Sequence, residues 1–210
     1  MSRVRVRPTR EETRHRLFEA AAGVFAEYGV GAATVEQIAS AAGFTRGAFY
    51  SNFTSKEELA VAMLEDHLEH SQASNRALAQ RHPDTRGFVQ ALREDESRPD
   101  DPLHLNPLLQ VELMLFVART PELRPALGEH LRMMRALVGE IAASTLRASG
   151  IEVSIDRDQM GTILVAVEDG LRLHRLIDPD STPADAFFTA LDALQRLVTA
   201  TTATDTTRNW

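Results

Sequence analysis

Three side chains near residue 50 could hold the phosphates and base edges of duplex DNA: Arg46, Tyr50 and Lys56. A guanidinium can fork onto guanine or clamp a phosphate, a phenol can bond a phosphate, and an ammonium is a compact point charge. On a helix, Gly47 shares one side with Arg46 and Tyr50, and a glycine lets another backbone approach closely. The residue types and their spacing therefore predict a surface that contacts DNA.

The stretch of residues 34–56 contains the elements that would position these side chains. Thr34 and Gln37 form a capping box, which predicts a helix start. Gly43 can adopt the left-handed conformation of a sharp turn, and Thr45 is expected to cap a second short helix. A helix, a short turn with glycine and a second helix together make the helix-turn-helix pattern.

The helix that follows this pattern is expected to begin at a further capping box, formed by Ser55 and Glu58. Lys56 lies in its first turn, where backbone N–H groups and the ammonium could face a phosphate. Two threonine caps are additional candidates, because a cap hydroxyl lies beside the helix N-terminus where a phosphate binds. Asn52 is another, because its side-chain amide can donate to a phosphate. Capping alone would also explain both threonines. The predicted DNA-binding residues are Thr34, Thr45, Arg46, Gly47, Tyr50, Asn52 and Lys56.

Hydrophobic spacing along the whole chain predicts an all-α fold with nine helices. The first three would form the DNA-contacting domain, and six would form a C-terminal helical bundle for ligand binding and dimerisation. The expected helices cover residues 9–29, 34–41, 45–51, 55–81, 85–94, 106–119, 120–149, 156–177 and 183–201. Pro125 lies one turn into the seventh of them, so its first turn is expected to be separate or kinked.

The motifs of the N-terminal part resemble those of the TetR family of one-component transcriptional regulators. The matching strings are Gly43–Phe53 and Ser55–Leu59, with Leu17–Ala21, Phe25 and Gly29 upstream, and the resemblance covers roughly residues 10–60. Asn52 departs from the pattern, because the family more often has histidine there. The resemblance implies a homodimer that binds a near-palindromic operator in double-stranded DNA and releases it when a small ligand binds.

Charge is distributed unevenly between the two expected domains. Residues 1–56 carry 8 Lys and Arg against 5 Asp and Glu, a net charge of +3, whereas the rest of the chain carries −10. The basic part can meet phosphate while the acidic part stays away from it. We expect a DNA-binding domain over 1–56 with a disordered basic arm at 1–8, a ligand-binding and dimerisation domain over 57–202, and a flexible tail at 203–210.

Composition narrows the possible classes of protein further. The 210 residues include no cysteine, which excludes disulfides, cysteine-ligated zinc fingers and thiol catalysis. No apolar stretch approaches the roughly 18 residues of a membrane-spanning helix, and the basic N-terminus leads into no apolar region typical of a signal peptide. We expect a cytoplasmic protein without a membrane partner.

The C-terminal part contains methionine, aromatic and histidine side chains that could border a ligand cavity. Methionine adapts to varied apolar shapes, and a polar group beside an apolar stretch could fix a ligand's orientation. Ordinary core packing is the alternative for each of them. The candidate ligand-binding residues are Met63, Glu112, Met114, Phe116, His130, Met134 and His174.

The helices over Asp156–Ile177 and Pro183–Thr201 are predicted to pair with their copies in a four-helix dimer interface, as the resemblance implies. Gly161 and Gly170 lie inside the first of them, and each costs roughly 1 kcal/mol of helix propensity relative to alanine. Close approach of another helix would explain both glycines.

Metal and catalytic sites are not expected. His67 and His70 have a spacing that could hold a metal, but no partner ligands are evident, and the pair Glu12 and His15 lies in the DNA-binding part, where a di-iron site has no place. An enzyme in a helical bundle is a rival class, yet no nucleophile–base spacing or phosphate loop is present. We therefore expect no cofactor and no catalytic residue.

The preferred interpretation is a repressor that a small, largely apolar effector releases from a palindromic operator. A transcriptional activator and a ligand-independent DNA-coating protein stay open as alternatives. The sequence names neither the effector nor the operator.

Overall fold

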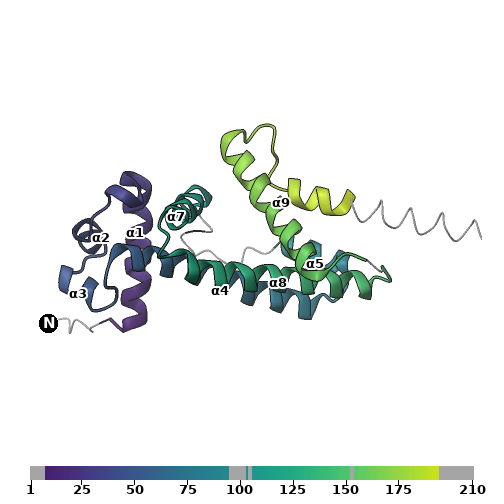
Figure 1. Ribbon diagram of the computed structural model, residues 1–210, viewed down its shortest axis with the longest axis horizontal. Helices are drawn as coiled ribbons and strands as arrows, with labels where there is room; N and C mark the ends of the chain where they lie inside the picture. The colour runs from purple at the N-terminus through teal and green to yellow at the C-terminus, as the bar shows by residue number, and fades with distance from the viewer. Residues whose placement is uncertain (1–7, 95–102, 104–105, 152–153, 194–210) are drawn as a thin grey trace, which may run out of the picture. The chain divides into compact units, whose positions relative to one another are not determined.

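The structure, a computed structural model, describes residues 8–94, 103, 106–151 and 154–193, and within them every regular element is a helix (Figure 1). This confirms the all-α prediction. The basic arm before Pro8, most of the expected loop at 94–102, the end of the last predicted helix and the tail lie outside the described residues. None of the described helices is long and apolar enough to cross a membrane. The helices are α1 (Arg10–Ala32), α2 (Val35–Ala41), α3 (Arg46–Tyr50), α4 (Lys56–Arg81), α5 (Thr85–Arg93), α7 (Pro107–Arg119), α8 (Arg124–Ala148), α9 (Arg157–Ile177) and the helical residues 186–193.

The chain folds into two compact units. The first consists of Met1–His67 with Arg98–Gly128, and the second of Leu68–Ser97 with Glu129–Trp210. The helix α4 contributes to both units, and α7 belongs to the first because it packs against α1. These units therefore cut the chain at other points than the predicted domain limits.

Aromatic side chains fill the core of the first unit. Phe25, Phe49 and Phe53 are almost completely buried, and the rings of Phe49 and Phe53 lie 5.9 Å apart between centroids. Phe18 from α1 lies the same distance from Phe53, which joins α1 to the segment after α3. Burying rings of this size is the main favourable term for so small a unit. The helices α1, α2 and α3 therefore hold one another in a fixed arrangement.

The first helix starts as predicted and ends differently. Thr9 accepts a hydrogen bond from the backbone N–H of Glu12, whose carboxylate accepts one from the backbone N–H of Thr9, so this capping box is confirmed. Gly29 was expected to end the helix, and its φ of 75° does break the regular helical path. A further turn nevertheless continues to Ala32, because the chain resumes helical geometry after the kink.

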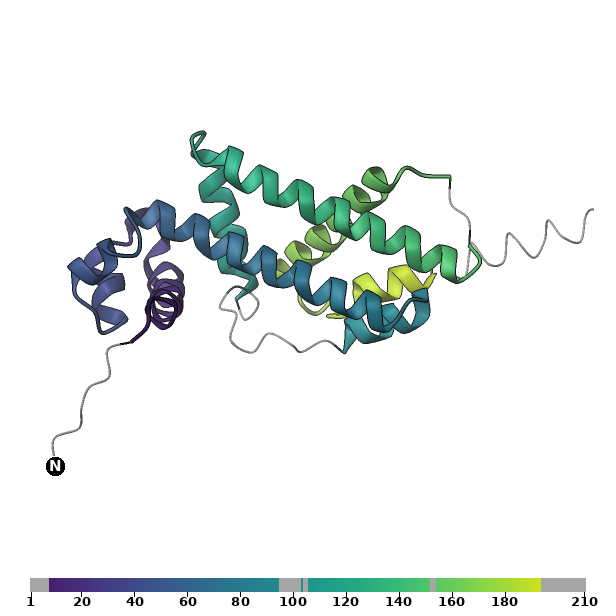
Figure 2. The same ribbon diagram turned by 90° about the horizontal axis from the view of Figure 1, so that it is seen from below.

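In the second unit, α8 and α9 cross (Figure 2). Two glycines, Gly139 and Gly161, lie at the crossing. A Cβ added to Gly139 would collide with the backbone carbonyl of Arg157, and one added to Gly161 would collide with that of Arg135. Each glycine therefore lies where the opposite backbone leaves no room for a side chain. Close approach explains Gly161 as predicted. Gly170 has no atom of the described residues within 4 Å of an added Cβ, so close packing there does not explain it.

The remaining helices of the second unit are tied to this pair by polar contacts. The hydroxyl of Ser149, near the end of α8, donates to Thr85 Oγ1 at 3.1 Å and so links α8 to the start of α5. At the other end of α5, Arg93 pairs with Asp192 at 3.2 Å and lies over the ring of Phe188 at 5.4 Å. These contacts fix both ends of the short α5.

Two predicted helices begin several residues later than expected. The stretch from Thr120 forms a separate turn, in which the backbone N–H of Leu123 donates to the carbonyl of Thr120, and α8 begins only at Arg124. Pro125 then occupies the second position of α8, where a missing N–H costs nothing. This confirms the predicted interruption. The last helix begins at residue 186 instead of Pro183, because residues 184 and 185 form a turn.

Candidate nucleic-acid interface

Reciprocal caps and one glycine build the turn between α2 and α3. Thr34 accepts from the N–H of Gln37 at 3.2 Å, and the side chain of Gln37 accepts from the N–H of Thr34 at 2.8 Å, which confirms this capping box. Gly43 has a φ of 70°, which favours glycine. Thr45 accepts from the N–H of Ala48 at 3.2 Å and so caps α3, as predicted. Local sequence thus fixes the helix-turn-helix.

The helix α3 has one buried and one exposed side. Phe49 is completely buried, whereas Tyr50 is 44% exposed and the Arg46 side chain is 62% exposed. The guanidinium of Arg46 lies 5.4 Å from the centre of the Tyr50 ring, and its Nη2 donates to the Tyr50 hydroxyl at 3.4 Å. The predicted cation and phenol therefore stand together on the exposed side.

Glu36 is a third member of this exposed group, and the sequence reasoning missed it. Its carboxylate Oε1 lies 2.7 Å from Nη1 of Arg46. The hydrogen bond to Tyr50, followed by the charge of Glu36, raises the pKa of Arg46 above its ordinary value. The sequence offered one signal. Glu36 lies in the first turn of α2, Arg46 is the first residue of α3, and a short turn joins the two helices.

Gly47 has no packing reason to be glycine. The nearest atom to an added Cβ is Thr45 Oγ1 at 3.8 Å, an ordinary contact, and the residue is exposed. A side chain would instead extend into the space in front of α3, beside Arg46 and Tyr50. The bare backbone leaves that space open to a large partner.

The side chain of Asn52 turns back onto the end of α3. Its Nδ2 donates to the carbonyl of Ala48 at 2.9 Å, and its buried Oδ1 has no partner within the described residues. The amide that was predicted to donate to a phosphate thus already satisfies a carbonyl at the end of α3. A DNA contact by Asn52 stays a prediction.

Lys56 satisfies the carbonyls at the end of α1. Its Nζ donates to the carbonyl oxygen of Gly31 at 2.6 Å and to that of Ala33 at 2.8 Å. An ammonium has three donors, so one is left for another acceptor. The single lysine of the chain therefore ties α1 to the start of α4 and keeps capacity for a phosphate.

The capping box predicted for Ser55 and Glu58 forms only on one side. Ser55 accepts from the N–H of Glu58 at 3.1 Å, but the Glu58 carboxylate accepts from the backbone N–H and the hydroxyl of Thr54 instead of from Ser55. These bonds lower the pKa of Glu58. Because the folded-state pKa is lowered, the stabilisation is present above the ordinary pKa of a glutamate and is lost as the pH falls through the lowered value.

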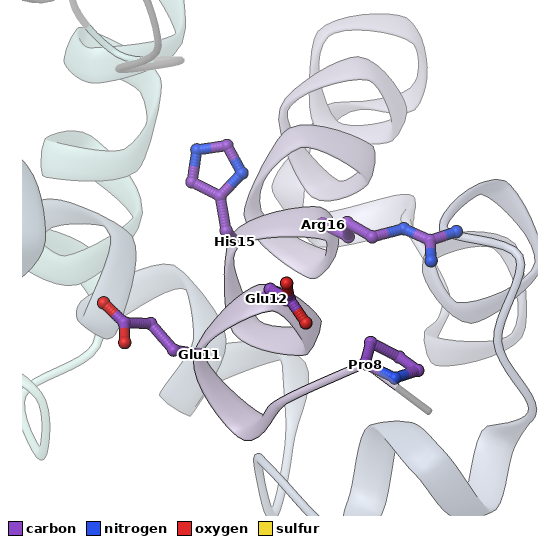
Figure 3. Close-up of a pocket in the computed structure, with 5 residues that line it drawn as sticks. All are labelled: Pro8, Glu11, Glu12, His15 and Arg16. Atoms are coloured by element: carbon purple, nitrogen blue, oxygen red, sulfur yellow. The ribbon is translucent and has the colours of Figure 1, made fainter. Parts of the chain in front are cut away.

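An open hollow lies at the start of α1, lined by Pro8, Glu11, Glu12, His15 and Arg16 (Figure 3). Its side chains spread in different directions, and two of its polar groups are already engaged. Glu12 belongs to the cap of α1, and Arg16 donates to the carbonyl of Ala42 at 2.7 Å, at the end of α2. The two carboxylates make it unsuited to phosphate.

The predicted ligand-binding residues are divided between the two units. Met63, Glu112, Met114 and Phe116 belong to the first, and His130, Met134 and His174 to the second. Met63 is buried, Glu112 reaches the kink of α1 at Gly29, and His174 is exposed. His130 lies 3.7 Å from Glu69, which was not predicted. The ligand-binding role of these residues stays a prediction.

Large apolar side chains remain exposed along α9. Ile163 is 51% exposed, Val167 42% and Ile177 78%. A contiguous exposed apolar patch is typical of an interaction surface, whereas single exposed apolar residues are common on any protein. Within the described residues, no group of three or more His, Asp or Glu side chains is placed to hold a metal ion.

Comparison with known protein families matches the N-terminal and the C-terminal part of the chain to related families. Residues 17–63 match the family described as bacterial regulatory proteins, tetR family, and residues 106–200 match the family described as tetracyclin repressor-like, C-terminal domain. The two matches together include more than half of the chain.

Individual relatives agree with this placement over part of their length. The HTH-type transcriptional regulator SrpR of Pseudomonas putida is 52% identical over 54 residues, which are 26% of this chain and 25% of that protein. TtgR of Pseudomonas putida, also an HTH-type transcriptional regulator, is 42% identical over 78 residues, 33% of this chain and 37% of that protein. The chain thus matches between a quarter and two fifths of the length of these curated relatives.

A solved structure extends the likeness to the whole fold. A protein from Pseudomonas aeruginosa PAO1, described as a transcriptional regulator, has a TM-score of 0.75 and 19% identity, with 92% of this chain and 93% of that chain covered. At this identity the likeness concerns the fold alone. Together with the two family matches and the capped helix-turn-helix, it leads to one conclusion: the chain belongs to the tetR family of bacterial regulatory proteins, which are DNA-binding transcription factors and not enzymes.

Proposed function

We propose that the chain is a ligand-responsive repressor that binds a palindromic operator as a homodimer and leaves it when a small, largely apolar effector binds. The observation that carries the DNA-binding part is the exposed side of α3, where Arg46, Gly47 and Tyr50 stand free of the core. Thr34, Thr45, Asn52 and Lys56 are proposed as supporting contacts. Because bacterial DNA lies in the cytoplasm, the proposed site of action is the cytoplasm.

Sequence selection from random duplexes tests this proposal directly. A dimer with two α3 helices should enter successive major grooves about 34–36 Å apart and so select two half-sites related by a dyad. Footprinting on the selected duplex should give one discrete protected region. Broad, sequence-independent protection would favour the DNA-coating alternative, and transcription assays with the same duplex would separate a repressor from an activator.

Arg46→Ala is expected to weaken operator binding about ten- to hundredfold, the loss typical of a cation that reads a base edge. Tyr50→Ala should weaken it less, because a neutral hydroxyl on a phosphate contributes less than a charged contact. Fluorescence anisotropy with the selected operator measures both. The matched control is Arg132→Ala, since the Arg132 side chain on α8 is 64% exposed and carries the same charge. Equal losses for Arg46→Ala and the control would contradict the assignment of α3.

The homodimer is proposed to form through the helices over Asp156–Ile177 and Pro183–Thr201. The exposed apolar residues of α9 support this, since pairing with a copy would cover them. In this arrangement residues 1–56 contact DNA and residues 57–202 bind the ligand and the second copy.

Val167→Glu should convert the dimer to monomers, because an unpaired carboxylate would be buried between two apolar helices. A cost of about 3 kcal/mol raises the dissociation constant about a hundredfold. Analytical ultracentrifugation over a concentration series measures this. Ser144→Glu, on an exposed position of α8 outside the proposed interface, is the control. A Val167→Glu protein that stays dimeric would place the interface elsewhere.

The effector is proposed to contact the methionine, aromatic and histidine candidates named for the ligand site. Support comes from their residue types, since methionine and aromatic side chains suit a small apolar molecule and a few polar groups can orient it. Release of DNA requires the ligand to prefer a conformation that binds the operator poorly. Screening small molecules for those that dissociate the operator complex tests this part separately from DNA recognition.

A further inference from the structure

The Glu36 carboxylate holds the main cation of α3 before any DNA arrives. Its Oε1 lies 2.7 Å from Nη1 of Arg46, while Nη2 of the same guanidinium donates to the Tyr50 hydroxyl. The guanidinium also lies over the Tyr50 ring. The cation is thus held in one place by a carboxylate from α2 and a phenol from α3.

Stability does not account for this ion pair. Both side chains are more than half exposed, 57% for Glu36 and 62% for Arg46, and pairs of this kind contribute little to folding. The pair has a larger effect on the binding of DNA, which is a polyanion, than on folding. Binding to unrelated DNA depends on cations that meet phosphates, and a carboxylate beside Arg46 cancels much of that attraction.

Base edges present both acceptors for Arg46 and a donor for Glu36, whereas phosphates present only acceptors. In the major groove, guanine O6 and N7 accept hydrogen bonds from an arginine, and the N4 amino group of cytosine donates to a carboxylate. A G·C edge can therefore satisfy Arg46 and Glu36 together, whereas a row of phosphates satisfies Arg46 and repels Glu36. A repulsive group of this kind raises specificity by weakening the wrong complexes more than the right one.

We propose that Glu36 is a specificity-determining residue, which holds Arg46 for a G·C edge and lowers its attraction to the phosphates of unrelated sequence. The inference rests on the proposed function, since it requires that α3 meets duplex DNA. Part of this effect passes through Arg46, so removing Arg46 should reduce the influence of Glu36 and leave only the direct effects of its carboxylate.

The test compares the full-length wild type with Glu36→Gln on two duplexes of equal length, the selected operator and a scrambled sequence. Glu36→Gln should tighten binding to the scrambled duplex about fivefold, the ratio expected when an exposed pair at the upper end of its range is removed. Binding to the operator should change by less than twofold. The matched control is Glu19→Gln, which removes the same charge from α1, where the carboxylate lies 3.8 Å from His15.

Two further measurements separate this role from a structural one. In an Arg46→Ala background, Glu36→Gln should tighten binding to the scrambled duplex less than it does in the wild-type background. Repeating the sequence selection with Glu36→Gln should relax base preference at the same operator position that Arg46→Ala relaxes. Thermal unfolding of every variant verifies that the helix-turn-helix remains folded.

The inference would be overturned if the ratio of operator affinity to scrambled affinity were the same in Glu36→Gln and wild type. Equal weakening on both duplexes would be one such result. In either case the wild type would still select its operator, so the proposed function would stand. A wild type that prefers no sequence at all would overturn the proposed function, and the role of Glu36 with it.

Discussion

Replacing Gly161 by alanine is expected to destabilise the second unit by about 1–3 kcal/mol, whereas Gly170→Ala in the same helix should stabilise it by about 0.5–1 kcal/mol. Helix propensity alone gives both changes the same sign, because alanine is favoured over glycine inside a helix. The opposite outcomes are expected because the two glycines of α9 have different neighbours.

The reason lies in the crossing of α8 and α9. A methyl group at Gly161 would overlap the carbonyl of Arg135, and Gly139 faces the carbonyl of Arg157 in the same way. Backbone atoms cannot rotate away as a flexible side chain can, so the two helices would have to separate along the crossing. That separation would loosen the packing of the buried apolar side chains around it. At Gly170, by contrast, no atom of the described residues lies within 4 Å of an added methyl group.

Urea unfolding of the two variants and the wild type measures these differences. Unfolding should be followed by far-ultraviolet circular dichroism at one fixed protein concentration, because a dimer's apparent stability depends on concentration. Gly139→Ala should behave like Gly161→Ala, since it meets the reciprocal carbonyl. A Gly161→Ala protein as stable as Gly170→Ala would mean that α8 and α9 do not cross at these glycines.

The sequence predicted best what depends on neighbouring residues. The capping boxes at Thr9 and Thr34 and the cap at Thr45 each involve groups three residues apart, so their spacing is visible in the sequence. The turn at Gly43 is similarly local. These local rules were sufficient to place α2 and α3 and to predict that Arg46 and Tyr50 would be exposed.

Contacts between distant residues account for what was missed. Glu36 and Arg46 are ten residues apart, and their pairing follows from the angle between α2 and α3. The crossing partner of Gly161 is Gly139, in another helix and 22 residues away. The capping box predicted for Ser55 and Glu58 forms only on one side, because Thr54 offers the Glu58 carboxylate two donors. The predicted ligand-binding residues fall in both compact units and are far apart in the sequence, and no periodic pattern specifies which of them would share a site.

Lys56→Ala is expected to reduce both the stability of the first unit and the salt dependence of operator binding. The ammonium donates to the carbonyls of Gly31 and Ala33, and removing it leaves both acceptors without that partner. Two hydrogen bonds from a charged donor, of which the one to Ala33 is partly buried, suggest a loss of about 1–3 kcal/mol. If the third donor meets a phosphate, the slope of log affinity against log salt should also fall by about 0.9.

Lys56→Gln separates these two roles, because an amide can still donate to a carbonyl but carries no charge. It should lose less stability than Lys56→Ala while showing the same reduction in slope. Thermal unfolding and anisotropy titrations over a range of salt concentrations measure the two effects independently. A slope that is unaltered in both variants would leave Lys56 with only its role at the end of α1. The cations that contact phosphate would then lie elsewhere on the exposed side of the helix-turn-helix, and Arg46 would be the first candidate for that contact.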